Sequence, residues 1–220
     1  MLNGTLLTPE RAYLDYVKPH IHKENWLYKS DPIESLDLDL SVRELLGCIL
    51  MAHLYKGTRG SEGPWHVGYD NTQAEPNDGL VQGSRDVYRM EHKIITNYQG
   101  RTTLDALVDL YDTYNNKGAN YGKDRTLLIQ ADAPSGPPGA PPGVLIKVSG
   151  LKDHIATGEC HFDHVMLIYV VSRSDAHAEF RILQSHPAPS GNPLYRVYFD
   201  LMTGSAKVIV HVGPDPSAKE

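Results

Sequence analysis

The sequence predicts an α+β fold in which N-terminal helices pack on a C-terminal antiparallel β-sheet. Two segments with helical end signals lie in the first half of the chain, and apolar segments of strand length lie in the last third. A run rich in proline and glycine, 131–143, separates them. Because proline cannot continue a helix or donate to a central strand, we expect this run to be a loop. The chain is therefore predicted to form a single domain, 1–220, with a helical part at 1–130 and a sheet at 143–213.

The two main helices are predicted from their ends. Ser41 and Glu44 form a capping-box pattern before an apolar run, and Gly57 offers a stop. The segment 102–118 has a threonine at its start and a glycine at its end, with helical spacing between them. Residues 57–100 are rich in Gly, Asn, Asp and Tyr, and we expect them to hold little regular structure.

Five candidate strands follow the proline-rich run and are predicted to form an antiparallel meander. They are "VLIKVSG", "HVMLIYVVS", "AEFRILQS", "LYRVYFDLM" and "AKVIVHV". A sixth segment, "RTLLIQA" at 125–131, has strand character but precedes the loop.

The bulk composition is that of a globular protein. Hydrophobic residues make up 40 % and charged residues 22 %, with a net charge of −6. The basic side chains form no stripe or tail, so we expect no nucleic-acid partner. The longest apolar run, "VMLIYVV", is too short for a transmembrane helix, so we expect no membrane partner. The N-terminus lacks a signal-peptide pattern, which leaves the cytoplasm or export by another route open.

Two histidines lie at the ends of a predicted hairpin. If the strands pair about Asp175, His164 faces His186 on the apolar side, with Cβ atoms roughly 4.5–5.5 Å apart. Two imidazoles in that position can act as a general base and the group that orients it. A shift of the turn by one residue would move His186 to the other face. The same histidines are equally consistent with the ends of two ordinary strands.

The chain has two cysteines, Cys48 and Cys160, which do not make a disulfide framework. Cys48 follows Gly47 and is the first candidate for a nucleophile. If a helix begins at Gly47, the helix dipole stabilises the Cys48 thiolate. If the helix begins at Ser41, Cys48 lies in its second turn and is equally well explained as a small buried apolar side chain.

The order of these parts resembles the papain-like cysteine hydrolases, especially the NlpC/P60 and CHAP families. "GCILMAHLY" is similar to the helix that carries the catalytic cysteine there, "PPGVLIKVSG" to a Pro-Gly-Asp strand, and "HVMLIYVV" and "ILQSH" to the strands with the catalytic histidine and the third residue. The resemblance implies that Cys48 is the nucleophile, His164 the general base and His186 the orienting residue. It further implies cleavage of an amide bond through a thioester, without a cofactor, in a peptide or peptidoglycan-like substrate. The sequence departs from the pattern at Gly47 and Val144, where the families have aspartate, and in a long insertion at 57–142.

Two other functions remain open. "CHFDH" places His161 and Asp163 at the spacing of a non-haem iron site, with His211 as the distal ligand. Alternatively, the chain is a non-enzymatic binding protein. It has 13 tyrosines and 2 tryptophans, and several of these in 57–121 are suited to line a ligand groove.

Overall fold

The structure is a computed structural model that describes residues 5–21, 41–59, 63–68, 79–95, 103–131, 148–187 and 193–211. The chain divides into two compact units. Unit 1 consists of Met1–His92, Arg173–Ala178 and Val197–Ile209, and unit 2 of Lys93–Ser172, Glu179–Arg196 and Val210–Glu220. Each unit therefore combines segments that are far apart in the sequence.

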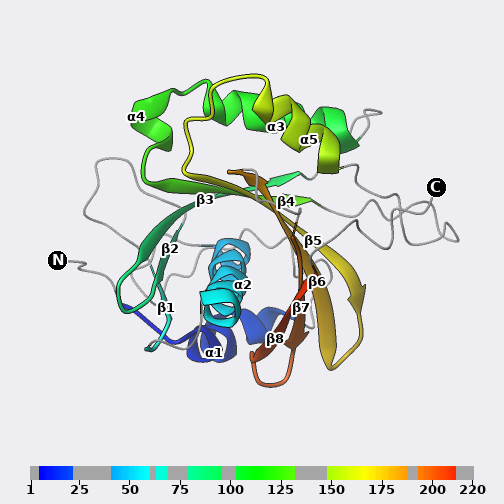
Figure 1. The fold of residues 1–220 in the computed structure, drawn as a ribbon. Helices are drawn as coiled ribbons and strands as arrows, with labels where there is room; N and C mark the ends of the chain where they lie inside the picture. The colour runs from blue at the N-terminus through cyan, green and yellow to red at the C-terminus, as the bar shows by residue number, and fades with distance from the viewer. Residues whose placement is uncertain are drawn as a thin grey trace, which may run out of the picture. The chain divides into compact units, whose positions relative to one another are not determined.

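Figure 1 shows the helices and strands. The helical segments are α1 (Pro9–Ala12), the π-helix η1 (Tyr13–Val17), the 3-10 helix η2 (Lys18–His20), α2 (Val42–Arg59), α3 (Thr103–Asn115), α4 (Ala119–Gly122) and α5 (Val148–Ala156). The strands are β1 (His66–Gly68), β2 (Gly79–Gln82), β3 (Val87–Ile95), β4 (Arg125–Ala131), β5 (His164–Arg173), β6 (His177–His186), β7 (Leu194–Asp200) and β8 (Ala206–His211).

The predicted fold class, N-terminal helices on a C-terminal antiparallel sheet, is wrong. The eight strands form a sheet in chain order, and three of them, β1 to β3, fall in 57–100, where little regular structure was expected. β1 has 3 residues and β2 has 4, and such short strands carry almost no periodic signal. They are defined by pairing, with Val67 opposite Val81 in an antiparallel register.

The sheet is mixed rather than antiparallel, because β4 and β5 run parallel from the pair Thr126 and His164 to the pair Ala131 and Tyr169. Parallel neighbours need a crossover connection, which is usually helical. The crossover here contains α5, which takes up the end of "VLIKVSG", a segment predicted as a strand. The remainder, 144–147, lies outside the described residues, as does most of the run 131–143.

In unit 1, α2 is buried along most of its length and packs against η1, β1 and β2. Its predicted capping box is confirmed: the Ser41 N–H donates to Glu44 Oε2 at 2.6 Å, and the Glu44 N–H donates to Ser41 Oγ at 3.4 Å. The predicted stop at Gly57 is wrong, since α2 continues to Arg59. A Cβ at Gly57 would lie 2.8 Å from Cβ of Val208, so the glycine allows a close approach instead of ending the helix.

In unit 2, α3 and α5 lie side by side (Figure 1) and cover strands β4 and β5. The predicted helix in 102–118 and the predicted strand at 125–131 are confirmed. All seven residues of β4 are buried. The core of unit 2 is formed by residues from β3, α3, β4, α5, β5 and the segment between α5 and β5.

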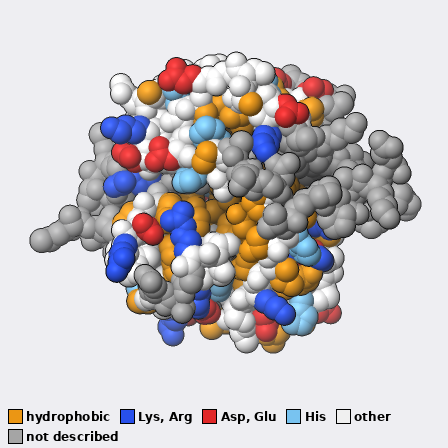
Figure 2. Space-filling view, in the orientation of Figure 1, with side chains coloured by type: hydrophobic (Ala, Val, Ile, Leu, Met, Phe, Trp, Pro, Cys, Tyr) orange, Lys and Arg blue, Asp and Glu red, His pale blue; other side chains and the backbone are white. Residues whose placement is uncertain are grey.

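None of the helices among the described residues is both long and apolar enough to span a membrane. On the face shown in Figure 2, acidic and basic side chains are interspersed, and neither sign covers a large continuous area.

Candidate functional site

The predicted nucleophile, Cys48, lies inside α2 of unit 1 and is 0 % exposed. It is the seventh residue of a helix that begins at Val42, so it lies beyond the first turn, where the helix dipole acts on a side chain. A thiol buried in this way meets no substrate unless the packing around α2 opens. The position of Cys48 agrees with the simpler interpretation of the sequence, a small apolar side chain in the core.

The two predicted histidines lie at strand ends in unit 2. His164 is the first residue of β5, His186 is the last residue of β6, and both are half-buried. Burial lowers the pKa of His186, and the Asp163 carboxylate partly opposes this change. Their direct opposition across the hairpin stays a prediction, as does the assignment of the roles of base and orienting residue.

The residues of the alternative iron site belong to different environments. The described residues hold no group of three or more His, Cys, Asp or Glu side chains arranged to bind a metal. His161 Nδ1 lies 3.8 Å from Glu159 Oε1, and the charge of Asp163 acts on His186. His211 is the last residue of β8.

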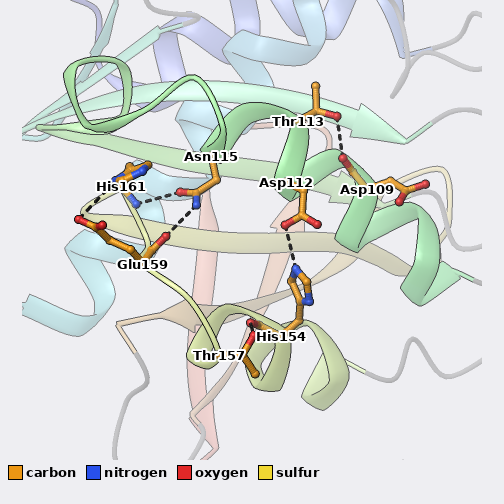
Figure 3. Close-up of polar contacts among 8 residues, drawn as sticks. All are labelled: Asp109, Asp112, Thr113, Asn115, His154, Thr157, Glu159 and His161. Atoms are coloured by element: carbon orange, nitrogen blue, oxygen red, sulfur yellow. Dashed lines mark hydrogen bonds and ion pairs between the residues drawn. The ribbon is translucent and has the colours of Figure 1, made fainter.

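Asn115, the last residue of α3, holds the backbone of the segment 157–163 of unit 2 (Figure 3). Asn115 donates from Nδ2 to the Glu159 carbonyl at 2.8 Å and accepts at Oδ1 from the His161 N–H at 2.9 Å. Gly122 of α4 packs against the same segment, because a Cβ there would overlap the His161 carbonyl. These contacts fix the backbone of 159–161 against the ends of α3 and α4.

A histidine and a carboxylate connect α5 to α3 in the same view (Figure 3). His154 Nε2 lies 2.8 Å from Asp112 Oδ1, and both side chains are more than a third exposed. The Tyr111 ring meets the His154 ring edge-on, with centroids 6.0 Å apart. A carboxylate that orients an imidazole is a common arrangement for a general base, but the group packed on His154 here is a tyrosine ring and not a nucleophile.

Cys160 differs from Cys48 in being partly exposed. Its Sγ donates to the Phe162 carbonyl at 3.6 Å. Burial, and then a hydrogen bond to Cys160, raises the pKa of the Tyr111 phenol well above its usual range, so the phenol remains protonated at neutral pH. Tyr111 thus ties the Cys160 segment to the core of unit 2.

Three cations of unit 2 lie over two tyrosine rings in a group that we call the cation–tyrosine cluster: Lys93, Tyr114, Lys117, Tyr121 and Arg125. The Lys117 ammonium lies 4.5 Å from the Tyr114 ring centroid and 4.1 Å from that of Tyr121. Lys93 Nζ lies 5.0 Å from the Tyr114 centroid, and Arg125 Cζ lies 4.7 Å from the Tyr121 centroid. Three cations therefore share two aromatic rings whose centroids are 6.5 Å apart.

The side chains of the cluster differ in their exposure to solvent. Lys117 is exposed, Lys93 and both tyrosines are half-buried, and Arg125 is only 6 % exposed. Each cation lies over a ring face, where the negative charge of the aromatic quadrupole attracts it. Phe162 meets the Tyr121 ring edge-on at 6.1 Å, which connects the cluster to the segment that Asn115 holds.

The aromatic residues of unit 1 are arranged differently. Tyr55 stacks on Tyr88 with ring centroids 4.3 Å apart, and the ring centroids of Trp65 and Tyr55 are 5.6 Å apart. Arg59 covers the two tyrosine rings and lies 3.5 Å from Asp86 Oδ2, so its charge has a carboxylate partner. Trp65 and Tyr55 are buried, so Trp65, which lies in the segment expected to line a ligand groove, is part of the internal packing of unit 1.

The tyrosines of 57–121 were expected to line a groove, but the cations beside them were not predicted. The four-residue intervals of Lys117, Tyr121 and Arg125 are no helical signal, because Lys117 follows α3, Tyr121 belongs to α4 and Arg125 begins β4. Lys93 could not be placed from the sequence, since it comes from β3. Comparisons with protein-family models, curated proteins and solved structures found no match to this chain.

Proposed function

We propose that the protein binds a small anionic ligand at the cation–tyrosine cluster of unit 2. The observation that carries the proposal is the position of the Lys117 ammonium, within 4.5 Å of two tyrosine ring centroids, each of which carries a second cation. This is a binding role, which agrees in kind with the third function left open by the sequence.

The rings support the proposal because they hold the cations in place before a ligand arrives. Ring faces attract an ammonium, but they do not satisfy its N–H donors as an oxygen atom does. An anion can therefore accept hydrogen bonds from Lys117 without displacing it from the rings. Side chains that are already ordered lose less conformational entropy on binding, which favours affinity.

The test is a titration of the full chain with inorganic phosphate at low ionic strength, followed by calorimetry and by amide chemical shifts. We expect saturable binding with shifts concentrated in 114–125. Lys117→Met removes the charge while keeping the length of the side chain, and it should weaken binding about tenfold, or roughly 1.4 kcal/mol.

Lys207→Met is the matched control, because Lys207 is an exposed lysine of β8 in unit 1. It changes the net charge by the same amount and should leave the affinity within a factor of two of the parent protein. Equal weakening by both variants would show that phosphate responds only to the overall charge, and absence of saturable binding would disprove the proposal.

The cysteine-hydrolase function stays a prediction. The burial of Cys48 gives it no support, whereas the placement of His164 and His186 at the ends of β5 and β6 is the part of its geometry that the described strands provide.

A further inference from the structure

We infer that Gly118 is a positioning residue of the anion site, because its backbone conformation holds Lys117 between the two tyrosine rings. Gly118 offers a ligand no side chain and acts only through Lys117. The inference rests on the proposed anion-binding function and adds a residue outside the cation–tyrosine cluster on which the affinity depends.

The Lys117 ammonium lies between the two rings. Its Nζ is 4.5 Å from the Tyr114 ring centroid and 4.1 Å from that of Tyr121, and the two centroids are 6.5 Å apart. These three distances define one triangle, so the ammonium lies in the angle that the rings form. An exposed lysine side chain otherwise samples many rotamers, and restricting them when a ligand binds lowers the affinity. The affinity of the site therefore depends on how the backbone places both rings around Lys117.

The two rings come from two helices, and Lys117 and Gly118 lie in the turn that joins them. Tyr114 belongs to the last turn of α3, and Tyr121 belongs to α4. The Lys117 N–H donates to the Tyr114 carbonyl at 3.2 Å, which ties Lys117 to α3. The Tyr121 N–H donates to the Gly118 carbonyl at 3.0 Å, which ties Gly118 to α4. The dihedral angles of Gly118 therefore set the position of Lys117 relative to the Tyr121 ring.

Gly118 has a backbone conformation that other residues avoid. Its φ is 88° and its ψ is 176°, a combination essentially restricted to glycine. A Cβ at this position would meet nothing within 4 Å. The need for glycine is thus one of conformation and not of space. An alanine at 118 relieves its strain by changing φ, which redirects the chain between Lys117 and Tyr121.

α4 cannot follow such a change freely, because its other end is fixed. A Cβ on Gly122 would lie 2.4 Å from the His161 carbonyl oxygen, so the backbone of α4 packs closely on the segment 157–163. Asp124, just after α4, has a φ of 59°, which a residue other than glycine keeps only where its surroundings enforce it. A changed conformation at Gly118 is therefore expected to move Lys117 rather than Tyr121.

The experiment measures the affinity of the full chain for inorganic phosphate by calorimetry. Gly118→Ala should weaken binding about fivefold, which is less than the complete removal of the Lys117 charge. The double variant Lys117→Met/Gly118→Ala should bind as Lys117→Met does, to within about a factor of two, because Gly118 acts through Lys117. Gly118→Asn is a second variant in case the alanine variant does not fold. Asparagine tolerates a positive φ but not a ψ near 176°, so this variant should also weaken binding.

Gly158→Ala is the matched control in unit 2. A Cβ at Gly158 also meets nothing within 4 Å, but its φ is not positive. This variant should leave the affinity within about a factor of two of the parent protein, because alanine fits the conformation without strain. A second measurement needs no ligand: the Lys117 Cε protons should show ring-current shifts in the NMR spectrum of the parent protein. Gly118→Ala should reduce these shifts, and Gly158→Ala should preserve them.

The outcomes separate the inference from the proposed function. If phosphate binds the parent protein and Gly118→Ala as tightly as each other, while Lys117→Met weakens binding, the inference alone is wrong. It is also wrong if Gly118→Ala weakens binding equally with and without the Lys117 ammonium, or if Gly158→Ala weakens it as much. If phosphate shows no saturable binding to the parent protein, both the inference and the proposed function fail.

Discussion

Unit 1 and unit 2 use their polar side chains in different ways. In unit 1, Tyr13 and His53 are almost fully buried and are directed at the backbone. The Tyr13 hydroxyl donates to the Leu201 carbonyl at 2.8 Å, and His53 Nε2 lies 2.9 Å from the Gly204 carbonyl. In unit 2, the cation–tyrosine cluster and the His154–Asp112 pair contain charged groups that water can reach.

The difference separates stability from binding. A buried polar group must be satisfied by the protein itself, since an unpaired one costs roughly 1–3 kcal/mol, and it is then unavailable to a ligand. Exposed charges contribute little to stability, and a ligand in solution can reach them. We therefore expect substitutions of the buried polar contacts in unit 1 to act mainly on folding, and substitutions of Lys117, the exposed cation of the cluster in unit 2, to act mainly on affinity.

The largest expected difference concerns the two cysteines, one in each unit. Iodoacetamide should label the half-exposed Cys160 roughly 1,000-fold faster than Cys48, because Cys48 reacts only after local unfolding that costs about 4 kcal/mol. Mass spectrometry of the Cys48→Ser and Cys160→Ser variants measures each rate separately. Rapid labelling of Cys48 in the folded protein would contradict its burial and would favour the predicted cysteine hydrolase.

Two glycines with positive φ, one in each unit, are expected to differ in how much a substitution by alanine lowers the free energy of unfolding. Gly204 has φ of 75°, and a Cβ there would lie 2.6 Å from Tyr13 Cδ1. Gly204→Ala should lower the free energy of unfolding by about 3 kcal/mol, from strain together with the clash. Gly118→Ala is the control, with φ of 88° and ψ of 176° but open space within 4 Å, and it should cost about 2 kcal/mol from backbone strain alone. Denaturation in urea measures both, and equal losses would mean that the Tyr13 contact is unimportant.

Asn115 is an exception in unit 2, because both of its polar atoms are used to hold the backbone of 159–161. Asn115→Ala should lower the free energy of unfolding by about 2 kcal/mol. Asn115→Asp keeps the acceptor for the His161 N–H but loses the donor to the Glu159 carbonyl. Its free energy of unfolding should therefore lie between those of the alanine variant and the parent protein. Thr113→Ala, which removes a bond within α3 on its exposed side, should change the stability by less than about 0.5 kcal/mol. A loss as large in Thr113→Ala would point to a general effect on α3.

The smallest expected effect is the pH dependence contributed by His53. Burial lowers the pKa of His53, and the hydrogen bond to the Gly204 carbonyl opposes this only in part. The unfolded chain therefore takes up the proton first as the pH falls. The contribution of neutral His53 to stability is complete above about pH 6.5 and is lost at lower pH, as the pH falls toward the lowered pKa of the folded protein.

We expect a loss of roughly 1 kcal/mol between pH 7 and pH 5, which His53→Gln should remove. Urea denaturation at several pH values measures it. His186→Gln gives the comparison in unit 2, where the pKa is also lowered by burial but the side chain is half-exposed, so its effect should be smaller. An unchanged slope in His53→Gln would show that other groups control the pH dependence.

The sequence predicted the elements that carry their own signals. The capping box at Ser41, the helix within 102–118, and the strands that end at His164 and His186 are all present. The short strands β1 and β2 were missed because a strand of three or four residues depends on its partner for definition. α5 was missed because the apolar run "VLIKV" suits a strand, and its helical continuation depends on the crossover between β4 and β5.

The candidate site was predicted only in part, for the same reason. The sequence singled out tyrosines such as Tyr114 but not the cations beside them. It did not join Lys93 to them, because Lys93 comes from a different strand, and it favoured Cys48 without knowing that α2 would be buried along most of its length.

By itself, the sequence determined local structure: where α2 begins, where β5 and β6 end, and which segments are apolar enough for a core. Caps, turns and side-chain periodicity act over a few residues, so they can be recognised without the rest of the chain. Only the tertiary structure decided the parallel pairing of β4 with β5, the burial of Cys48 and the gathering of three cations on two tyrosine rings. These depend on contacts between segments distant in sequence, where packing and burial outweigh local preference.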